Sequence, residues 1–213
     1  DHPVFCLGMK ELINKDENLQ VVASEESAKK ACDVIRKVMP ALVIVDISLK
    51  DGNGIDLIDA IRTDFGELPI LLLSMYDESL YAERAIRAGA NGYITKREAT
   101  GQIVKAIRSV LDGDIYVSSK IKDKVFRQFI SRQQSEEVFA LDTLTNRELE
   151  VFRLIGEGLA TKEIAEILHL SIKTIGTYRE KIKEKLSLKH YTELVKVAVH
   201  WSQTRRVKCV SES

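Results

Sequence analysis

The chain is poor in cysteine and has no long apolar run. Its 213 residues hold three cysteines, an odd number without metal-ligand spacing, which favours reduced thiols over a disulfide framework. No apolar run approaches the roughly 18 residues that a membrane span needs, and no secretory signal pattern is present. We therefore expect a globular protein of the cytoplasm that makes no contact with a membrane.

The chain also lacks net charge, but this zero conceals two oppositely charged halves. Residues 1–118 hold 19 acidic and 14 basic residues, a net charge of −5, and residues 119–213 hold 13 and 18, a net charge of +5. This asymmetry suggests a regulatory module joined to a polyanion-binding module. Because residues 131–137 are polar, we predict a first domain at 1–118, a linker at 119–141 and a second domain at 142–213.

The first half alternates short apolar runs with stretches of helical period. The runs that predict β-strands are residues 19–23, 41–45, 69–73 and 92–95. The stretches that predict helices are residues 4–15, 25–38, 54–65, 78–88 and 98–112. A strand-to-strand spacing of about 25 residues suits right-handed βαβ crossovers. The pattern therefore predicts an α/β domain with a doubly wound parallel sheet.

Polar side chains stand where three of these predicted strands end: Asp46, Ser74 and Lys96. Parallel sheets carry ligands and chemistry just past the carboxyl ends of their strands, so we expect the three side chains at one edge. Asp46 there could act as a nucleophile or a metal ligand. The alternatives are a turn-initiating aspartate before the Asp-Gly-Asn-Gly segment 51–54 and a solvated surface lysine at position 96.

From Leu144 onward the pattern is helical throughout. Thr145 and Glu148 form a capping box at the first helix, and further helices are predicted at 161–168, 172–186 and 192–201. A three-residue turn between the second and third helices predicts a helix-turn-helix. Residues 173–189 hold six basic and two acidic residues, a surface typical of a DNA-reading helix. The alternative is a plain four-helix bundle that serves as an interaction module.

The ordered motifs of the first half resemble the receiver domain of bacterial two-component response regulators. The segments that carry this resemblance are residues 1–3, 44–46, 51–54, 73–74 and 89–96. The resemblance implies a flavodoxin-like fold in which Asp46 accepts a phosphoryl group from a histidine kinase. It also implies Mg²⁺ bound by Asp1, Asp46 and the backbone carbonyl of Ser48, oxygen ligands that suit a hard cation. The lysine that pairs with the phosphoryl group, the switch hydroxyl and the switch aromatic match Lys96, Ser74 and Tyr93.

Two features depart from the receiver pattern. The family's first strand and the acid that precedes Asp1 are absent, so we expect roughly five to eight further residues in the native protein. Lys50 stands where the family often has Pro.

The second half resembles the LuxR/NarL-type DNA-binding domain through residues 144–151, 158–165 and 170–186. The resemblance implies that helix 172–186 enters the major groove of double-stranded DNA. The residues expected near base edges are Lys173, Gly176, Thr177 and Glu180. The residues expected at phosphates and helix starts are Thr161, Lys162, Lys173, Thr174 and Lys181. Gly176 and Tyr178 depart from the usual Lys and His, and helix 192–201 resembles the family's dimerisation helix.

The whole chain thus resembles a NarL/FixJ-type response regulator, a non-enzymatic transcription factor that forms a homodimer when active. RNA polymerase is a candidate further partner. The alternative is a phosphorylation-independent DNA-binding regulator whose receiver serves for docking or dimerisation. A phosphatase of the haloacid dehalogenase type is disfavoured, because such enzymes carry an aspartate two residues after the nucleophile, where Ser48 stands.

Overall fold

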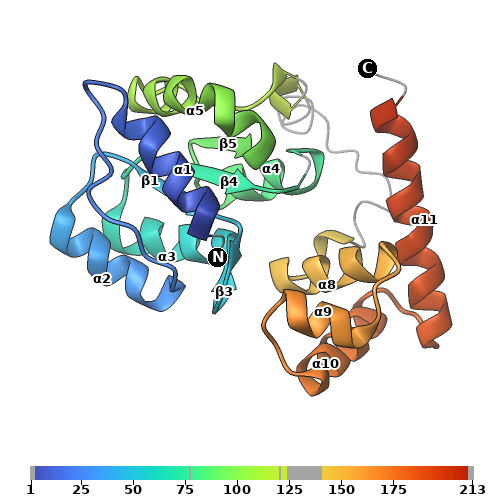
Figure 1. The fold of residues 1–213 in the computed structure, drawn as a ribbon. Coiled ribbons are helices and arrows are strands. Elements are labelled where there is room, and N and C mark those ends of the chain that lie inside the picture. The colour runs from blue at the N-terminus through green and yellow to red at the C-terminus, as the bar shows by residue number, and fades with distance from the viewer. Residues whose placement is uncertain (1–2, 77, 120, 124–140, 211–213) are drawn as a thin grey trace. The chain divides into compact units, whose positions relative to one another are not determined.

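The computed structural model describes residues 3–76, 78–119, 121–123 and 141–210 (Figure 1). The chain forms two compact units, Asp1–Arg132 and Gln133–Ser213. The linker predicted at 119–141 falls mostly outside the described ranges. No helix within those ranges is long and apolar enough to cross a membrane.

The first unit is built on a parallel sheet with the strand order β1-β4-β5. These strands are β1 (Val43–Asp46), β4 (Ile70–Ser74) and β5 (Gly92–Thr95), and Tyr116 adds a single parallel bridge to Gly92. The helices are α1 (Pro3–Asn14), α2 (Ala28–Val38), α3 (Gly54–Phe65), α4 (Glu78–Arg87) and α5 (Lys96–Leu111). These elements confirm the predicted α/β class.

Helices cover both faces of this sheet, as the sheet's buried strands require (Figure 1). On one face α1 and α5 pack on a core that includes Met9, Ile13, Leu71, Leu73 and Ile94. On the other, α3 contacts β1 and α4 contacts β5, while α2 lies beside α3. The doubly wound arrangement places the carboxyl ends of all three strands at one edge.

The strand predicted at residues 19–23 was wrong, because this segment joins no sheet in the described structure. Leu19 and Val21 pack against the core, but Val22 is 58% exposed. In the flavodoxin-like order 2-1-3-4-5 the second strand pairs only with the first. In the sheet, that first strand would lie between residues 19–23 and β1, and the described residues hold no such strand. The backbone of residues 19–23 therefore has no neighbouring strand to pair with.

The prediction also missed a hairpin and misplaced two helix starts. The short strands β2 (Ser48–Leu49) and β3 (Gly52–Asn53) pair antiparallel directly after β1. Helix α2 begins three residues later than predicted, and α5 begins two residues earlier, after a Thr95–Glu98 capping box. The start of α5 depends on this capping box, whereas the first N–H of α2 donates to Asp51 from the distant hairpin. Apolar periodicity reveals neither contact.

In its described residues the second unit holds the four predicted helices, α8 (Asn146–Gly156), α9 (Thr161–Ile167), α10 (Ile172–Lys185) and α11 (Tyr191–Val210). The capping box at Thr145 and Glu148 is confirmed. A Cβ on Gly156 would overlap the backbone of Ala198, so this glycine permits α8 and α11 to pack closely. The turn between α9 and α10 confirms the helix-turn-helix, and α11 extends nine residues beyond the predicted end.

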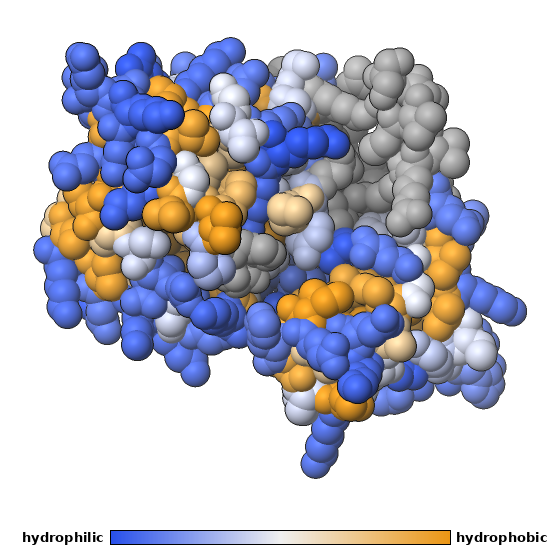
Figure 2. All heavy atoms as spheres, in the orientation of Figure 1, coloured by the Kyte–Doolittle hydropathy of each residue, from blue (hydrophilic) through white to orange (hydrophobic). Residues whose placement is uncertain are grey.

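Hydrophilic side chains cover most of the surface that Figure 2 shows, with apolar side chains in small groups. This distribution is ordinary for two units that each bury a core of their own.

Candidate functional site

The ends of the strands bring Asp46, Ser74 and Lys96 to one edge of the sheet. In the ladder Asp46 lies opposite Leu73, and Ser74 lies opposite Thr95, the residue before Lys96. The Lys96 Nζ atom lies 2.5 Å from Asp46 Oδ2. The Lys96 side chain is 3% exposed and that of Asp46 is 16% exposed. The edge therefore holds a carboxylate that solvent reaches only in part, with one buried cation beside it.

The loop after β1 wraps tightly around Asp46. The Ser48 backbone N–H donates to Asp46 Oδ1 at 3.2 Å, and the Gly54 N–H donates to the Ile47 carbonyl at 2.8 Å. A Cβ at position 54 would overlap the backbone carbonyl of Asp46. Only glycine lets α3 begin this close to the backbone of Asp46. Because one Asp46 oxygen meets Ser48 and the other meets Lys96, the orientation of the carboxylate is fixed.

The β2–β3 hairpin is fastened to the start of α2. Asp51 accepts hydrogen bonds from the Ser27 hydroxyl at 2.7 Å and from the Ala28 backbone N–H at 2.8 Å. The Ser27 hydrogen bond holds the pKa of Asp51 below its ordinary value. Lys50 forms an ion pair with Glu26 and thereby lowers the pKa of that carboxyl. The lysine that replaces the family's proline therefore joins the hairpin to the segment before α2.

Ser74 and Tyr93 both bind the backbone of one residue, Tyr76. Ser74 Oγ, which is fully buried, accepts from the Tyr76 N–H at 2.9 Å, and the Tyr93 hydroxyl donates to the Tyr76 carbonyl at 2.8 Å. The two residues predicted to form the switch are thus joined through the backbone of Tyr76. Sequence reasoning had no signal for Tyr76, because its backbone rather than its side chain makes both contacts.

The predicted Mg²⁺ ligands can be described only in part, because Asp1 lies outside the described residues. Asp46 and the backbone of Ser48 lie side by side at the sheet edge. Carboxylate and carbonyl oxygens are the donors that Mg²⁺ takes. The donor set therefore fits Mg²⁺ in its chemistry.

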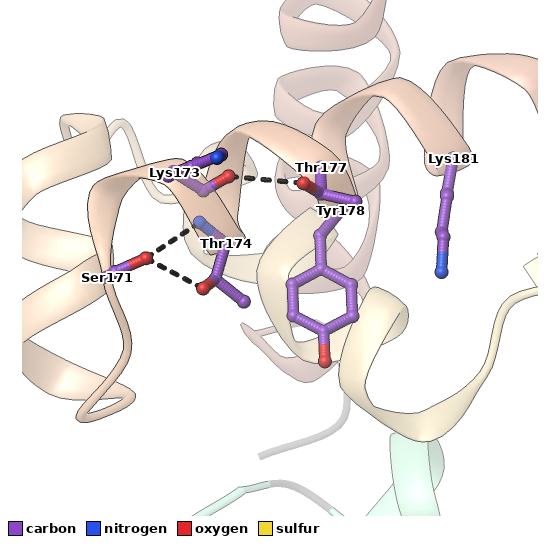
Figure 3. A pocket seen from close by; sticks show the side chains of 6 residues that line it. All are labelled: Ser171, Lys173, Thr174, Thr177, Tyr178 and Lys181. Carbon is purple, nitrogen blue, oxygen red and sulfur yellow. Dashed lines mark hydrogen bonds between the residues drawn. The ribbon is translucent and has the colours of Figure 1, made fainter.

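Helix α10 carries most of the predicted DNA contacts. A shallow hollow on this helix is lined by Ser171, Lys173, Thr174, Thr177, Tyr178 and Lys181 (Figure 3). Ser171 caps the helix by accepting from the Thr174 N–H at 3.0 Å, and the Thr177 hydroxyl donates to the Lys173 carbonyl at 3.2 Å. Both contacts support the helix itself.

The side chains of α10 form two neighbouring stripes, because residues three or four apart share a helix face. Lys173, Gly176, Thr177 and Glu180 form the first, which holds all the residues predicted near base edges. Thr174, Tyr178 and Lys181 form the second; Figure 3 shows the last two pointing the same way. Helical spacing predicted that Tyr178 faces inward with Ile175 and Ile182, but this prediction was wrong: Tyr178 is only half-buried and lines the hollow beside Lys181. Its spacing from Thr174 and Lys181 could have revealed this stripe.

The predicted basic surface of this helix needs a correction. The Arg179 guanidinium donates to the Thr161 hydroxyl at 2.9 Å and lies 3.4 Å from the centroid of the Tyr191 ring. Lys185 donates to Glu148 Oε2 at 2.6 Å. Both bases therefore connect α10 to neighbouring helices, although Lys185 stays partly exposed. Lys183 forms an ion pair with Glu180 at 2.7 Å. The acid that was predicted to contact a base is therefore already paired.

The three lysines that are predicted to contact DNA are exposed. Lys173 and Lys181 are exposed and form no ion pair among the residues that the structure describes. Lys162 is exposed at the start of α9, 4.0 Å from Glu166. A Cβ on Gly176 would meet no atom within 4 Å, so the surface is open there.

Comparisons with known proteins agree with this architecture. Residues 1–108 match the profile of the response regulator receiver domain, and residues 142–198 match that of the luxR family of bacterial regulatory proteins. The oxygen regulatory protein NreC of Staphylococcus epidermidis is 33% identical over 204 residues, which are 93% of this chain and 94% of NreC. The NreC of Staphylococcus haemolyticus is 34% identical over 203 residues, with the same shares.

Solved structures are similar over one or both units. A LuxR-family response regulator from Aurantimonas is 31% identical, with a TM-score of 0.56 over 62% of this chain and 94% of that one. RcsB from Salmonella enterica serovar Typhimurium, bound to the rprA promoter with the phosphomimetic BeF3−, is 26% identical. Its TM-score is 0.59 over 92% of this chain and 93% of RcsB.

Proposed function

This chain belongs to the two-component response regulators that join a receiver domain to a LuxR-type DNA-binding domain, and we propose that phosphorylation of Asp46 controls its binding to DNA. The main support is the buried ion pair between Asp46 and Lys96 at the carboxyl edge of the sheet. Parallel sheets carry their chemistry at this edge. A receiver domain implies a histidine kinase as the phosphoryl donor.

The transfer uses an Asp46 carboxylate oxygen as the nucleophile. This oxygen attacks the phosphorus of the kinase phosphohistidine, the phosphorus–nitrogen bond breaks, and an acyl phosphate forms on Asp46. The Lys96 ammonium then follows the negative charge to a phosphoryl oxygen. Receiver domains generally use Mg²⁺ for this transfer, and we propose that Asp1, Asp46 and the Ser48 carbonyl hold it. When bound, Mg²⁺ offsets the charge on the transferring oxygens.

The signal leaves the site through Ser74 and Tyr93. The new phosphoryl group carries a charge of roughly −1.5 to −2 at neutral pH. Ser74 accepts from the Tyr76 N–H and can still donate its own proton to a phosphoryl oxygen. Movement of Ser74 also moves the backbone of Tyr76, whose carbonyl accepts a hydrogen bond from the Tyr93 hydroxyl. The surface near α5 then changes, which favours a homodimer.

Helix α10 reads double-stranded DNA in the major groove in this proposal. Lys173, Gly176, Thr177 and Glu180 face base edges, where Glu180 leaves Lys183 and accepts from cytosine N4. Phosphates are held by Lys173, Lys181 and the helix-start amides near Thr161 and Lys162, with Thr174 beside them. RcsB, which is similar to this chain over both units, has been solved bound to promoter DNA, which supports DNA as the ligand of this domain. We also propose that the chain forms its homodimer through α11. It acts in the cytoplasm, where it contacts RNA polymerase.

The site of phosphorylation can be tested by mapping. The purified chain is incubated with a small-molecule phosphodonor and Mg²⁺, the acyl phosphate is trapped by borohydride reduction, and peptides are identified by mass spectrometry. We expect the label on Asp46 and none in Asp46→Asn. Asp59→Asn is the matched control, since Asp59 is an exposed carboxylate of α3. Labelling of Asp46→Asn at the wild-type level would contradict the proposal.

The alternative, a receiver that only docks or dimerises, is not favoured. Such a module has no need of a cation buried beside the phosphoacceptor, and burial of Lys96 is costly unless the ammonium is paired.

A further inference from the structure

The Lys96 ammonium has two neighbours that matter. On one side lies the Asp46 carboxylate, 2.5 Å away. On the other lies the aromatic ring of Phe5, whose centroid is 5.2 Å from Lys96 Nζ. Apart from Asp46, no hydrogen-bond acceptor among the described residues binds this ammonium. The cation is therefore held between a carboxylate and the face of a ring.

Burial makes the ring contact important. A cation within about 6 Å of a ring centroid is attracted to the ring, and the attraction is strongest where water is excluded. The Lys96 side chain is 3% exposed, so little water competes with the ring. Lysine ammonium groups otherwise need hydrogen-bond acceptors when they are buried. The ring of Phe5 supplies part of the electrostatic stabilisation that further hydrogen-bond acceptors would give the ammonium.

The position of Phe5 follows from how α1 packs. Phe5, Met9 and Ile13 are spaced by four residues and share the face of α1 that packs on the core under α5. Helix α5 begins at Lys96, directly after β5. The packing of α1 against α5 therefore sets the ring of Phe5 over the first residue of α5.

We propose that Phe5 is a positioning residue for phosphoryl transfer, which holds the Lys96 ammonium at Asp46 and keeps water from it. This inference rests on the proposed role of Asp46. During transfer the negative charge moves from the carboxylate to the phosphoryl oxygens, and the ammonium must follow. The ring attracts the cation throughout and carries no charge of its own, so it limits movement of the ammonium toward solvent without competing for a proton.

The test is the rate of phosphorylation by a small-molecule phosphodonor in Phe5→Leu. Leucine keeps an apolar side chain on α1 but removes the ring. We expect the rate to fall roughly 5- to 30-fold, as loss of a desolvated cation–π contact implies. Phe65→Leu is the matched control, because the Phe65 ring lies 5.7 Å from Arg36, away from Asp46. Its rate should stay at the wild-type value.

A second series separates electrostatics from packing. Position 5 is replaced by phenylalanines that carry progressively more fluorine on the ring, which weakens the attraction for cations but keeps an apolar ring. The rate should fall steadily along this series. Full activity in every fluorinated protein, or in Phe5→Leu, would overturn the proposal and leave Phe5 a packing residue only.

An NMR measurement separates this inference from the proposed function. Without any phosphodonor, the ε-methylene protons of Lys96 should show a ring-current shift that disappears in Phe5→Leu. If the wild type shows no such shift, the positioning role is wrong. If the shift is present but Asp46 takes no phosphoryl group, the proposed function is wrong, although the contact between Phe5 and Lys96 exists. The proposed role of Phe5 in phosphoryl transfer is then wrong as well.

Discussion

Lys96 and Lys181 are both proposed to contact phosphate, but their surroundings are opposite. Lys96 is buried, meets one carboxylate and one ring, and begins a helix at the edge of a sheet. Lys181 is exposed on α10 and forms no ion pair within the described residues. A buried cation can act on a single group with fixed geometry. An exposed cation suits a polyanion, because its salt-sensitive attraction tolerates many positions.

The same contrast divides the bases of α10 itself. Lys173 and Lys181 face solvent, whereas Arg179 and Lys185 contact Thr161 and Glu148 on neighbouring helices. Residue type alone therefore does not reveal which bases meet DNA. Orientation around the helix decides it.

Lys96→Ala should have the largest effect. Removing a preorganised charge that stabilises a transferring group typically lowers rates by about 10²- to 10³-fold. We expect a loss of this size in phosphorylation by a small-molecule donor, followed as acyl phosphate formed over time. Lys105→Ala, an exposed lysine of the same helix, should leave the rate unchanged. A Lys96→Ala protein as fast as the control would contradict the role of the buried pair.

Lys185→Ala and Lys181→Ala should separate structural from DNA-binding lysines. Loss of Lys185 leaves the buried Glu148 carboxylate without its cation, so the free energy of unfolding should fall by about 1–3 kcal/mol. Loss of Lys181 should leave stability unchanged but reduce the slope of log affinity against log salt by about 0.9. Denaturant unfolding and DNA binding over a salt series measure the two effects. An equal salt slope in Lys181→Ala and wild type would remove Lys181 from the interface.

Gly176 offers a gain-of-function test on the open surface of α10. A side chain there meets no neighbour, so Gly176→Ala should stabilise the helix by about 1 kcal/mol without new DNA contacts. Gly176→Lys should also increase affinity and steepen the salt slope by about 0.9. Thermal unfolding and DNA titration distinguish the two variants. Unchanged affinity in Gly176→Lys would mean that this position does not face DNA.

The smallest expected effect concerns pH. Burial raises the pKa of Glu148, but hydrogen bonds from Lys185 and Thr145 outweigh it, so the pKa lies below the ordinary value of 4.5. A lowered folded-state pKa stabilises the fold above pH 4.5, and this stabilisation is lost as the pH falls through the lowered pKa. Denaturant unfolding measured from about pH 6 down to about pH 3, a range that spans the ordinary value of 4.5, should show that loss. Lys185→Ala should weaken it, and an identical pH profile would contradict the assignment.

The apolar runs predicted β1, β4 and β5 well because strands buried on both faces carry continuous signals. They failed at residues 19–23, where the segment is apolar but pairing depends on a neighbouring strand. The apolar period of a segment does not show whether that neighbour is present. The capping boxes at Thr95 and Thr145 each involve side chains and backbone within four residues of one another. Such local contacts can be predicted from residue spacing, as the capping box at Thr145 was.

The residues of the site divide in the same way. Asp46, Ser74 and Lys96 could be predicted because each follows a strand, and sheet topology brings strand ends together. Phe5 and Tyr76 could not, because their contacts come from helix packing and from a backbone carbonyl. The inward turn of Arg179 depends on how α10 rotates against its neighbours, which charge counts do not show.

The most direct measurement is fluorescence anisotropy of labelled promoter DNA titrated with wild type and Asp46→Asn, each with and without a phosphodonor and Mg²⁺. Phosphorylation control predicts that the donor tightens DNA binding by the wild type and has no effect on Asp46→Asn. Equal stimulation of both proteins, or specific binding by the wild type that ignores the donor, would contradict it.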